Sequence, residues 1–144
     1  MKTASLFIDN SFASGDPFEF IVNLPQDAVE VYRNVKSIEI DTFCIPKIED
    51  EIAFIISISN VDTKLSSNNP FTSQNFVAFF DNSLLAPGDF KPCDKIGDQI
   101  CVFSPPRDLG HSFRIRISKL DGSSVDSTMT GGEERVYITF KITT

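Results

Sequence analysis

Residues 135–142 read RVYITFKI, in which Arg, Tyr, Thr and Lys alternate with apolar side chains. Successive side chains of a β-strand point to opposite faces of the sheet, so this pattern is typical of a strand with one buried and one solvated face. The same alternation recurs at residues 18–23, 37–41, 52–59 and 113–118. A shift of one residue would exchange the two faces, so the pattern also specifies the register of each strand.

Weaker strand candidates lie at residues 2–8, 74–80 and 99–103, which brings the predicted strands to eight. The chain holds 16 Ile and 14 Phe but only 7 Leu and 6 Ala. Branched and aromatic residues favour strands, whereas Ala and Leu favour helices. One helical turn is expected at residues 27–32. Turns are expected at residues 104–106 and, as a hairpin-type turn, at the glycine pair 131–132.

The 144 residues suit one domain, residues 1–144. We therefore expect an all-β protein, a two-sheet antiparallel β-sandwich built as an eight-stranded single jelly roll. An immunoglobulin-like sandwich is the nearest alternative. Two long connections, residues 61–73 and 81–98, are the expected place for a binding surface, because long loops on a sheet scaffold commonly carry one.

Three phenylalanines, Phe12, Phe71 and Phe90, fall outside the alternating segments. Such side chains either close the ends of a sandwich or anchor a partner protein, since aromatic side chains dominate interface energetics. Arg114 and Arg116 share the outer face of one predicted strand, where they either contact an acidic partner or are simply solvated. These five residues are the candidate protein-interface residues.

The sequence predicts neither an enzyme nor a cofactor. It contains no Gly-x-Ser-x-Gly motif and no phosphate-binding glycine pattern, and its single histidine, His111, is interpreted as a loop residue. A zinc site would need His111 to meet Cys44, Cys93 and Cys101 from three separate segments, although zinc ligands usually come as closely spaced pairs. The acidic residues 49–51 are interpreted as a solvated turn, with an ion site as the alternative.

Charge and cysteine content narrow the function classes further. The net charge of −7 argues against nucleic acid as a partner, because nucleic-acid binding depends on cationic contacts to phosphate. No apolar run approaches the roughly 20 residues of a spanning helix. Three cysteines, an odd number, favour a reducing compartment such as cytosol over a disulfide framework, although a Cys93–Cys101 bridge stays open as an alternative.

Two segments carry a resemblance to a known class of proteins. Residues 34–46, NVKSIEIDTFCIP, resemble the early N-V-x-S-I-x-L … I-P strand of small capsid-associated β proteins of large icosahedral double-stranded DNA viruses. Residues 109–126, LGHSFRIRISKLDGSSVD, are similar to the late L … F-x-I-x-I … L-D-G … V-D strand and turn of the same proteins. Together the two segments cover 31 of 144 residues.

The resemblance implies a structural virion protein, either a minor capsid or cement protein or a jelly-roll penton protein. Its partners would be the major capsid protein and other capsid components, and a penton protein would be a homopentamer. It would reside in the capsid of the virion after assembly in the host cytoplasm. A function of another class is a ligand-binding β-sandwich of the carbohydrate-binding type, although such modules usually expose Trp or Tyr and this chain has no Trp and two Tyr.

Overall fold

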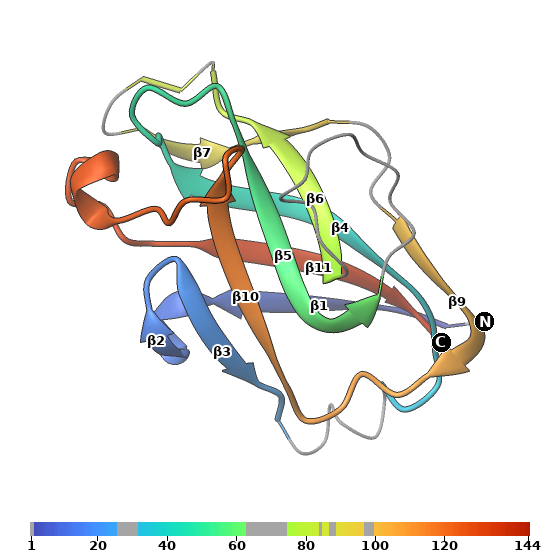
Figure 1. Ribbon diagram of the computed structural model, residues 1–144. Helices are drawn as coiled ribbons and strands as arrows, with labels where there is room; N and C mark the ends of the chain where they lie inside the picture. The colour runs from blue at the N-terminus through green and yellow to red at the C-terminus, as the bar shows by residue number, and fades with distance from the viewer. Residues whose placement is uncertain (1, 26–31, 63–74, 84, 87–88, 97–99) are drawn as a thin grey trace.

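The computed structural model describes residues 2–25, 32–62, 75–83, 85–86, 89–96 and 100–144 (Figure 1). No α-helix occurs in these residues. They form eleven strands and two short 3-10 helices: β1 (Thr3–Asp9), η1 (Asn10–Phe12), β2 (Ser14–Asp16), β3 (Glu19–Asn23), β4 (Val35–Pro46), β5 (Ala53–Asp62), β6 (Asn75–Asp81), β7 (Phe90–Pro92), β8 (Asp94–Lys95), β9 (Ile100–Arg107), β10 (Ser112–Lys119), η2 (Ser127–Thr130) and β11 (Tyr137–Thr143).

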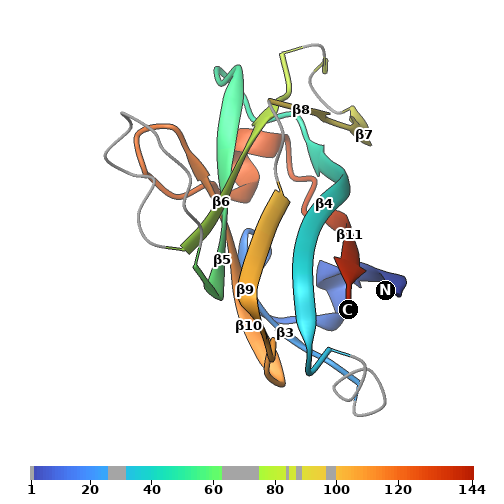
Figure 2. The ribbon, with the colours of Figure 1, turned by 90° about the vertical axis from the view of Figure 1, so that its right-hand side faces the viewer.

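The strands form two antiparallel sheets that pack face to face (Figure 2). The five-stranded sheet has the order β1-β11-β4-β7, with β9 also paired to β4. The six-stranded sheet has the order β2-β3-β10-β5-β6-β8. The prediction of an all-β protein with two antiparallel sheets is therefore confirmed.

The chain passes repeatedly from one sheet to the other. Among the long strands, β1, β4, β9 and β11 lie in the five-stranded sheet, whereas β3, β5, β6 and β10 lie in the six-stranded sheet. Among these eight long strands of the described residues, only β5 and β6 follow each other within one sheet. The two ends of the chain meet beside β1 and β11, where the backbones of Lys2 and Thr144 exchange hydrogen bonds of 3.0 and 2.8 Å.

The core lies between the sheets and consists of the apolar side chains that alternate with polar ones in each of these segments. In β11, for example, Ile138, Phe140 and Ile142 are fully buried, whereas Lys141 is exposed. Three phenylalanines join the two layers: the ring of Phe43 in β4 lies 5.4 Å from that of Phe54 in β5 and 4.8 Å from that of Phe80 in β6. Such aromatic contacts add to the burial of apolar area that drives packing.

Each of the eight predicted strands overlaps an observed strand, but the number of strands differs from the prediction. The three additional strands, β2, β7 and β8, have only two or three residues. Two of them, β7 and β8, lie within the connection predicted at residues 81–98. Strands of this length carry too little alternation to be recognised in a sequence.

Two predicted turns differ from the structure. Strand β9 continues to Arg107 through the predicted turn at residues 104–106, and the register with β4 shifts there. Proline lacks an N–H group, so it is tolerated where a ladder is irregular or lies at a sheet edge. Gly131 and Gly132 do not form a hairpin: with φ values of 65° and 85° they end η2. The helical turn predicted at residues 27–32 lies outside the described residues except for Tyr32.

Candidate protein-interaction surface

Phe12 is the most exposed large apolar side chain in the described part of the chain, at 91%. It lies in η1, which turns the chain from β1 in one sheet towards β2 in the other. The Asp9 carboxylate caps this turn, because its Oδ1 accepts hydrogen bonds from the Ser11 N–H at 2.9 Å and the Ser11 hydroxyl at 2.7 Å. A side-chain cap stabilises the backbone of such a turn, so the exposed Phe12 side chain projects from an ordered segment.

An apolar groove of about 310 Å³ lies beside Phe12. It is lined by residues 6–9 at the end of β1, residues 12–13 and residues 22–25 at the end of β3. Among the described residues of this lining Asp9 alone carries a charge, and Phe7 is 61% exposed. The groove therefore opens between the margins of the two sheets, and Phe7 and Phe12 both border it.

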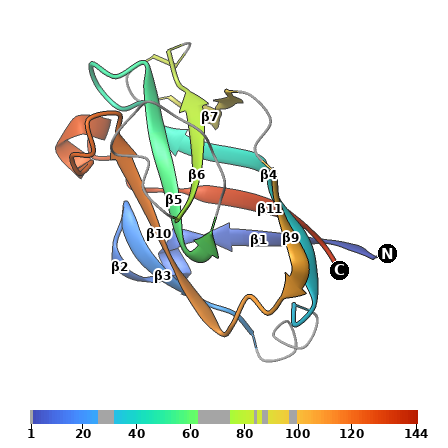
Figure 3. The ribbon, with the colours of Figure 1, turned by 45° about the vertical axis from the view of Figure 1, so that its right-hand side comes forward.

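Strand β1 is the last strand of its sheet in the part of the chain that the structure describes (Figure 3). The hydrogen bonds between Lys2 and Thr144, and from the Asn10 N–H to the Val136 carbonyl at 3.2 Å, fix the phase of the β1–β11 ladder. In an antiparallel pair the hydrogen-bonded residues alternate. The even-numbered residues of β1 therefore bond to β11, and the N–H and C=O groups of Thr3, Ser5 and Phe7 point to the open edge.

A row of aromatic side chains crosses the outer face of the five-stranded sheet. The Tyr137 ring lies 5.6 Å from the Phe7 ring and 5.2 Å from the Phe90 ring, and the Arg135 guanidinium lies 4.5 Å from the centroid of Phe90. Arg135 also donates two hydrogen bonds, of 2.7 and 3.0 Å, to the Glu133 carboxylate. Phe90 is thus half-buried in contacts within the chain.

The two candidate arginines of β10 have different surroundings. Arg114 is 58% exposed and lies 3.7 Å from the Glu19 carboxylate on the neighbouring strand β3. Arg116 donates to the carbonyl of Gly122 at 2.8 Å and to the Ser124 hydroxyl at 3.4 Å. Both lie on the outer face of the six-stranded sheet. Arg114 is paired with Ile21, the residue before Val22 of the groove lining, whereas Arg116 bonds to the turn that follows its own strand. Phe71 lies outside the described residues.

Strong hydrogen bonds and burial shift several pKa values in this region. The hydrogen bonds from Arg135 lower the pKa of Glu133, and the same contact raises the pKa of Arg135. Burial raises the pKa of the Cys44 thiol, and it raises that of Cys93 to about 12. Both cysteines are free thiols in the structure. Thiols with raised pKa values carry little thiolate at neutral pH and are poor nucleophiles.

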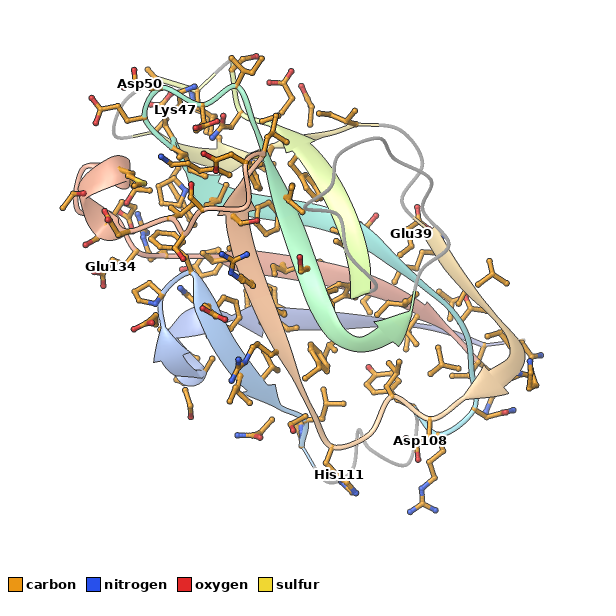
Figure 4. The ribbon with its side chains drawn as sticks, in the orientation of Figure 1. Glu39, Lys47, Asp50, Asp108, His111 and Glu134 are labelled. Carbon is orange, nitrogen blue, oxygen red and sulfur yellow. The ribbon has the colours of Figure 1, made fainter. Side chains whose placement is uncertain are left out.

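The remaining polar candidates lie at the two ends of the sandwich (Figure 4). His111 is exposed at the end where the chain enters β10, whereas Lys47 and Asp50 lie at the opposite end. Lys47 Nζ donates to the carbonyls of Glu51 and Asn82, both at 3.1 Å, which ties the acidic turn 49–51 to the loop after β6. Among the described residues, no group of three or more His, Cys, Asp or Glu side chains is placed to hold a metal ion.

Phe7 is the interface candidate that sequence reasoning missed. The sequence predicts a strand at residues 2–8, and the apolar residues Ala4, Leu6 and Ile8 form the inner face of the observed strand. Phe7 lies on the opposite, solvated face of the strand, together with Thr3 and Ser5. A large apolar side chain on the solvated phase of an edge strand is the signal that could have identified it.

In the described residues, no helix has the length and apolar character that a membrane crossing requires. Neither the protein-family models nor the curated proteins include a match to this chain.

Proposed function

We propose that this protein is a structural component of an icosahedral virion. In this role it is a minor capsid or cement protein, or a penton protein, that stabilises the capsid through contacts with the major capsid protein and other capsid components. Its place is the capsid of the virion, after assembly in the host cytoplasm.

The strand order is the observation that carries this proposal. Reduced to its long strands, the five-stranded sheet has the order β1-β11-β4-β9, and the six-stranded sheet has the order β3-β10-β5-β6. An eight-stranded jelly roll consists of two Greek keys arranged over two sheets, and it is a common architecture of viral capsid proteins. An immunoglobulin-like sandwich keeps several consecutive strands in one sheet, whereas here only β5 and β6 do so. The order therefore favours the single jelly roll.

Two further observations support an assembly role. The segments that resemble capsid-associated proteins, residues 34–46 and 109–126, include β4 and β10, which lie inside the two sheets rather than at their margins. The open margin of the sandwich presents Phe7 and Phe12, which are 61% and 91% exposed, beside the apolar groove. Exposed apolar patches that border a groove are typical of protein-binding surfaces.

The test is to look for the protein in particles. Antibodies against the purified chain are expected to label virions, and quantitative mass spectrometry of salt-washed particles is expected to give a fixed copy number. A stable pentamer by native mass spectrometry would favour a penton protein, whereas a monomer would favour a cement protein or, if particles lack it, a module outside a virion. The proposal is wrong if the protein is absent from washed particles, or if a glycan array shows specific binding of an oligosaccharide by the chain.

A further inference from the structure

The open edge of β1 and the apolar groove lie side by side and share residues. Thr3, Ser5 and Phe7 direct their backbone N–H and C=O groups to the open edge, as the ladder with β11 requires. Residues 6–9 of the same strand line the groove. A strand that paired with β1 would therefore send alternate side chains into the groove and the others to the solvated face, beside Phe7.

The alternation of side chains along an added strand determines which of them enter the groove. In an antiparallel or parallel addition, the side chains on the inner face lie on the same side of the sheet as Leu6 and Ile8, which pack against the core. The outer side chains lie beside Phe7, which is 61% exposed. The occupant is thus an extended segment with apolar inward side chains, and this is strand addition to a sheet edge.

A second copy of this chain fits the edge poorly. If two β1 strands paired, their inward side chains would be Ala4, Leu6 and Ile8, and these already pack against their own core. They could not also fill the partner's groove. A segment without a sandwich of its own, such as an extended arm of another polypeptide, has its inward side chains free. The groove therefore fits an extended peptide arm better than it fits the edge strand of a second folded copy.

The charge of the chain and the apolar area exposed beside the groove also indicate what kind of segment binds there. The chain carries a net charge of −7, and among the described residues that line the groove Asp9 alone is charged, so a cationic segment is favoured. A phenylalanine can bury roughly 150–250 Å². Covering Phe7 and Phe12 would then remove about 300 Å² from water, more than a third of the roughly 800 Å² that each partner contributes to a standard interface.

We infer that β1 accepts an extended, cationic peptide arm of another polypeptide as an additional strand, with the apolar side chains of the arm in the groove bordered by Phe7 and Phe12. This inference deepens the proposed function and rests on it for the identity of the arm as part of a neighbouring capsid component. The binding itself needs only the edge and the groove.

The direct test uses the capped peptide KVTVTVK, whose valines match the groove and whose threonines match the open edge. Titrated into the ¹⁵N-labelled full chain, it is expected to shift the amide signals of Ser5, Phe7 and Val22 and to slow the exchange of the Ser5 and Phe7 amides. The same peptide with all its threonine and valine amides methylated cannot donate to β1 in either strand direction, and EVTVTVE reverses the charge. Both control peptides are expected to bind at least about ten-fold more weakly.

Substitutions in the chain provide the matched controls. Ser5→Pro removes an N–H group that the β11 ladder does not use and is expected to weaken peptide binding about ten-fold, whereas Ser5→Thr is expected to change it less than about two-fold. If Ser5→Pro lowers the thermal stability, Thr3→Pro replaces it. Phe12→Ser, at the groove itself, is expected to weaken binding without affecting the fold.

Three results would overturn the inference: no binding of KVTVTVK, equal binding of the methylated peptide, or amide shifts confined to other surfaces. A dimer of the free chain that Ser5→Pro dissociates would assign the edge to a second copy and would overturn it too. Detection of the protein in washed particles does not depend on the peptide. A negative peptide result with particle association intact would thus reject the arm and leave the proposed function standing.

Discussion

The Arg135 guanidinium lies over the ring of Phe90, 4.5 Å from its centroid, while its Nε and Nη2 atoms donate hydrogen bonds to the two carboxylate oxygens of Glu133. The contact belongs to an aromatic row that runs from Phe90 on β7 through Tyr137 on β11 to Phe7 on the edge strand β1. A guanidinium over an aromatic face is attracted by the ring quadrupole. Arg135 thus fixes one end of the row, and the exposed Phe7 forms the other.

Removal of Arg135 should raise the pKa of Glu133. The hydrogen bonds from Arg135 are the largest cause of the lowered pKa of this carboxyl. Because the folded-state pKa lies below the unfolded-state value of about 4.3, the pair stabilises the fold above that pH, and its contribution is lost as the pH falls through the folded-state pKa. An NMR titration of Glu133 in Arg135→Ala should show a pKa close to the ordinary value.

The matched control is Arg114→Ala, which removes an arginine from the opposite sheet. Its removal should leave the titration of Glu133 unchanged, because Arg114 lies beside Glu19 instead. A Glu133 pKa that stays low in Arg135→Ala would show that Arg135 does not hold this carboxylate.

Phe43→Ala should destabilise the fold by about 3–5 kcal/mol, the usual cost of removing a buried phenylalanine. Phe43 is fully buried and joins the two sheets through its contacts with Phe54 and Phe80. Urea denaturation followed by circular dichroism measures the loss, and Phe43→Leu serves if the alanine variant does not fold. Phe12→Ala is the control, with an expected change below about 0.5 kcal/mol because the side chain is exposed. Equal losses in the two variants would contradict this assignment of the core.

The sequence predicts the long strands well because each one buries a single face. At β10, for example, Phe113, Ile115 and Ile117 are buried, and the arginines between them lie on the outer face. Register and layer follow from that alternation. The short strands β7 and β8 could not be predicted, since two or three residues carry no period and pair only because the sheets are already formed.

The candidate site was less predictable than the fold. Phe12 is an interface candidate in the sequence because it falls outside the alternating segments, and it is the most exposed large apolar side chain of the described residues. Phe90 interrupts the pattern in the same way, but Tyr137 and Arg135 cover it. The sequence does not distinguish the two cases, because the contacts of Phe90 come from a strand more than forty residues away along the chain. The groove likewise exists only where the ends of β1 and β3 meet.

Arg116→Met should destabilise the fold more than Arg114→Met. Arg116 donates to the Gly122 carbonyl and to Ser124 across the turn after β10, and a hydrogen bond from a charged group contributes roughly 1.5–3 kcal/mol at most. Arg114 forms an exposed ion pair with Glu19, which is worth about 0–1 kcal/mol. Chemical denaturation of both variants checks the order, and a larger loss for Arg114→Met would contradict it.

Amide hydrogen exchange along β1 should alternate from residue to residue. The pairing of Lys2 with Thr144 and the bond from Asn10 to Val136 place the even-numbered amides in the ladder with β11. The amides of Ala4, Leu6 and Ile8 are therefore expected to exchange slowly, whereas those of Ser5 and Phe7 should exchange fast, because exchange needs an amide that is not hydrogen-bonded. Exchange followed by ¹⁵N–¹H spectra resolves each residue. Uniformly slow exchange in the isolated chain would mean that the edge is already covered, and uniformly fast exchange would mean that β1 opens as a unit and offers no stable edge to a partner.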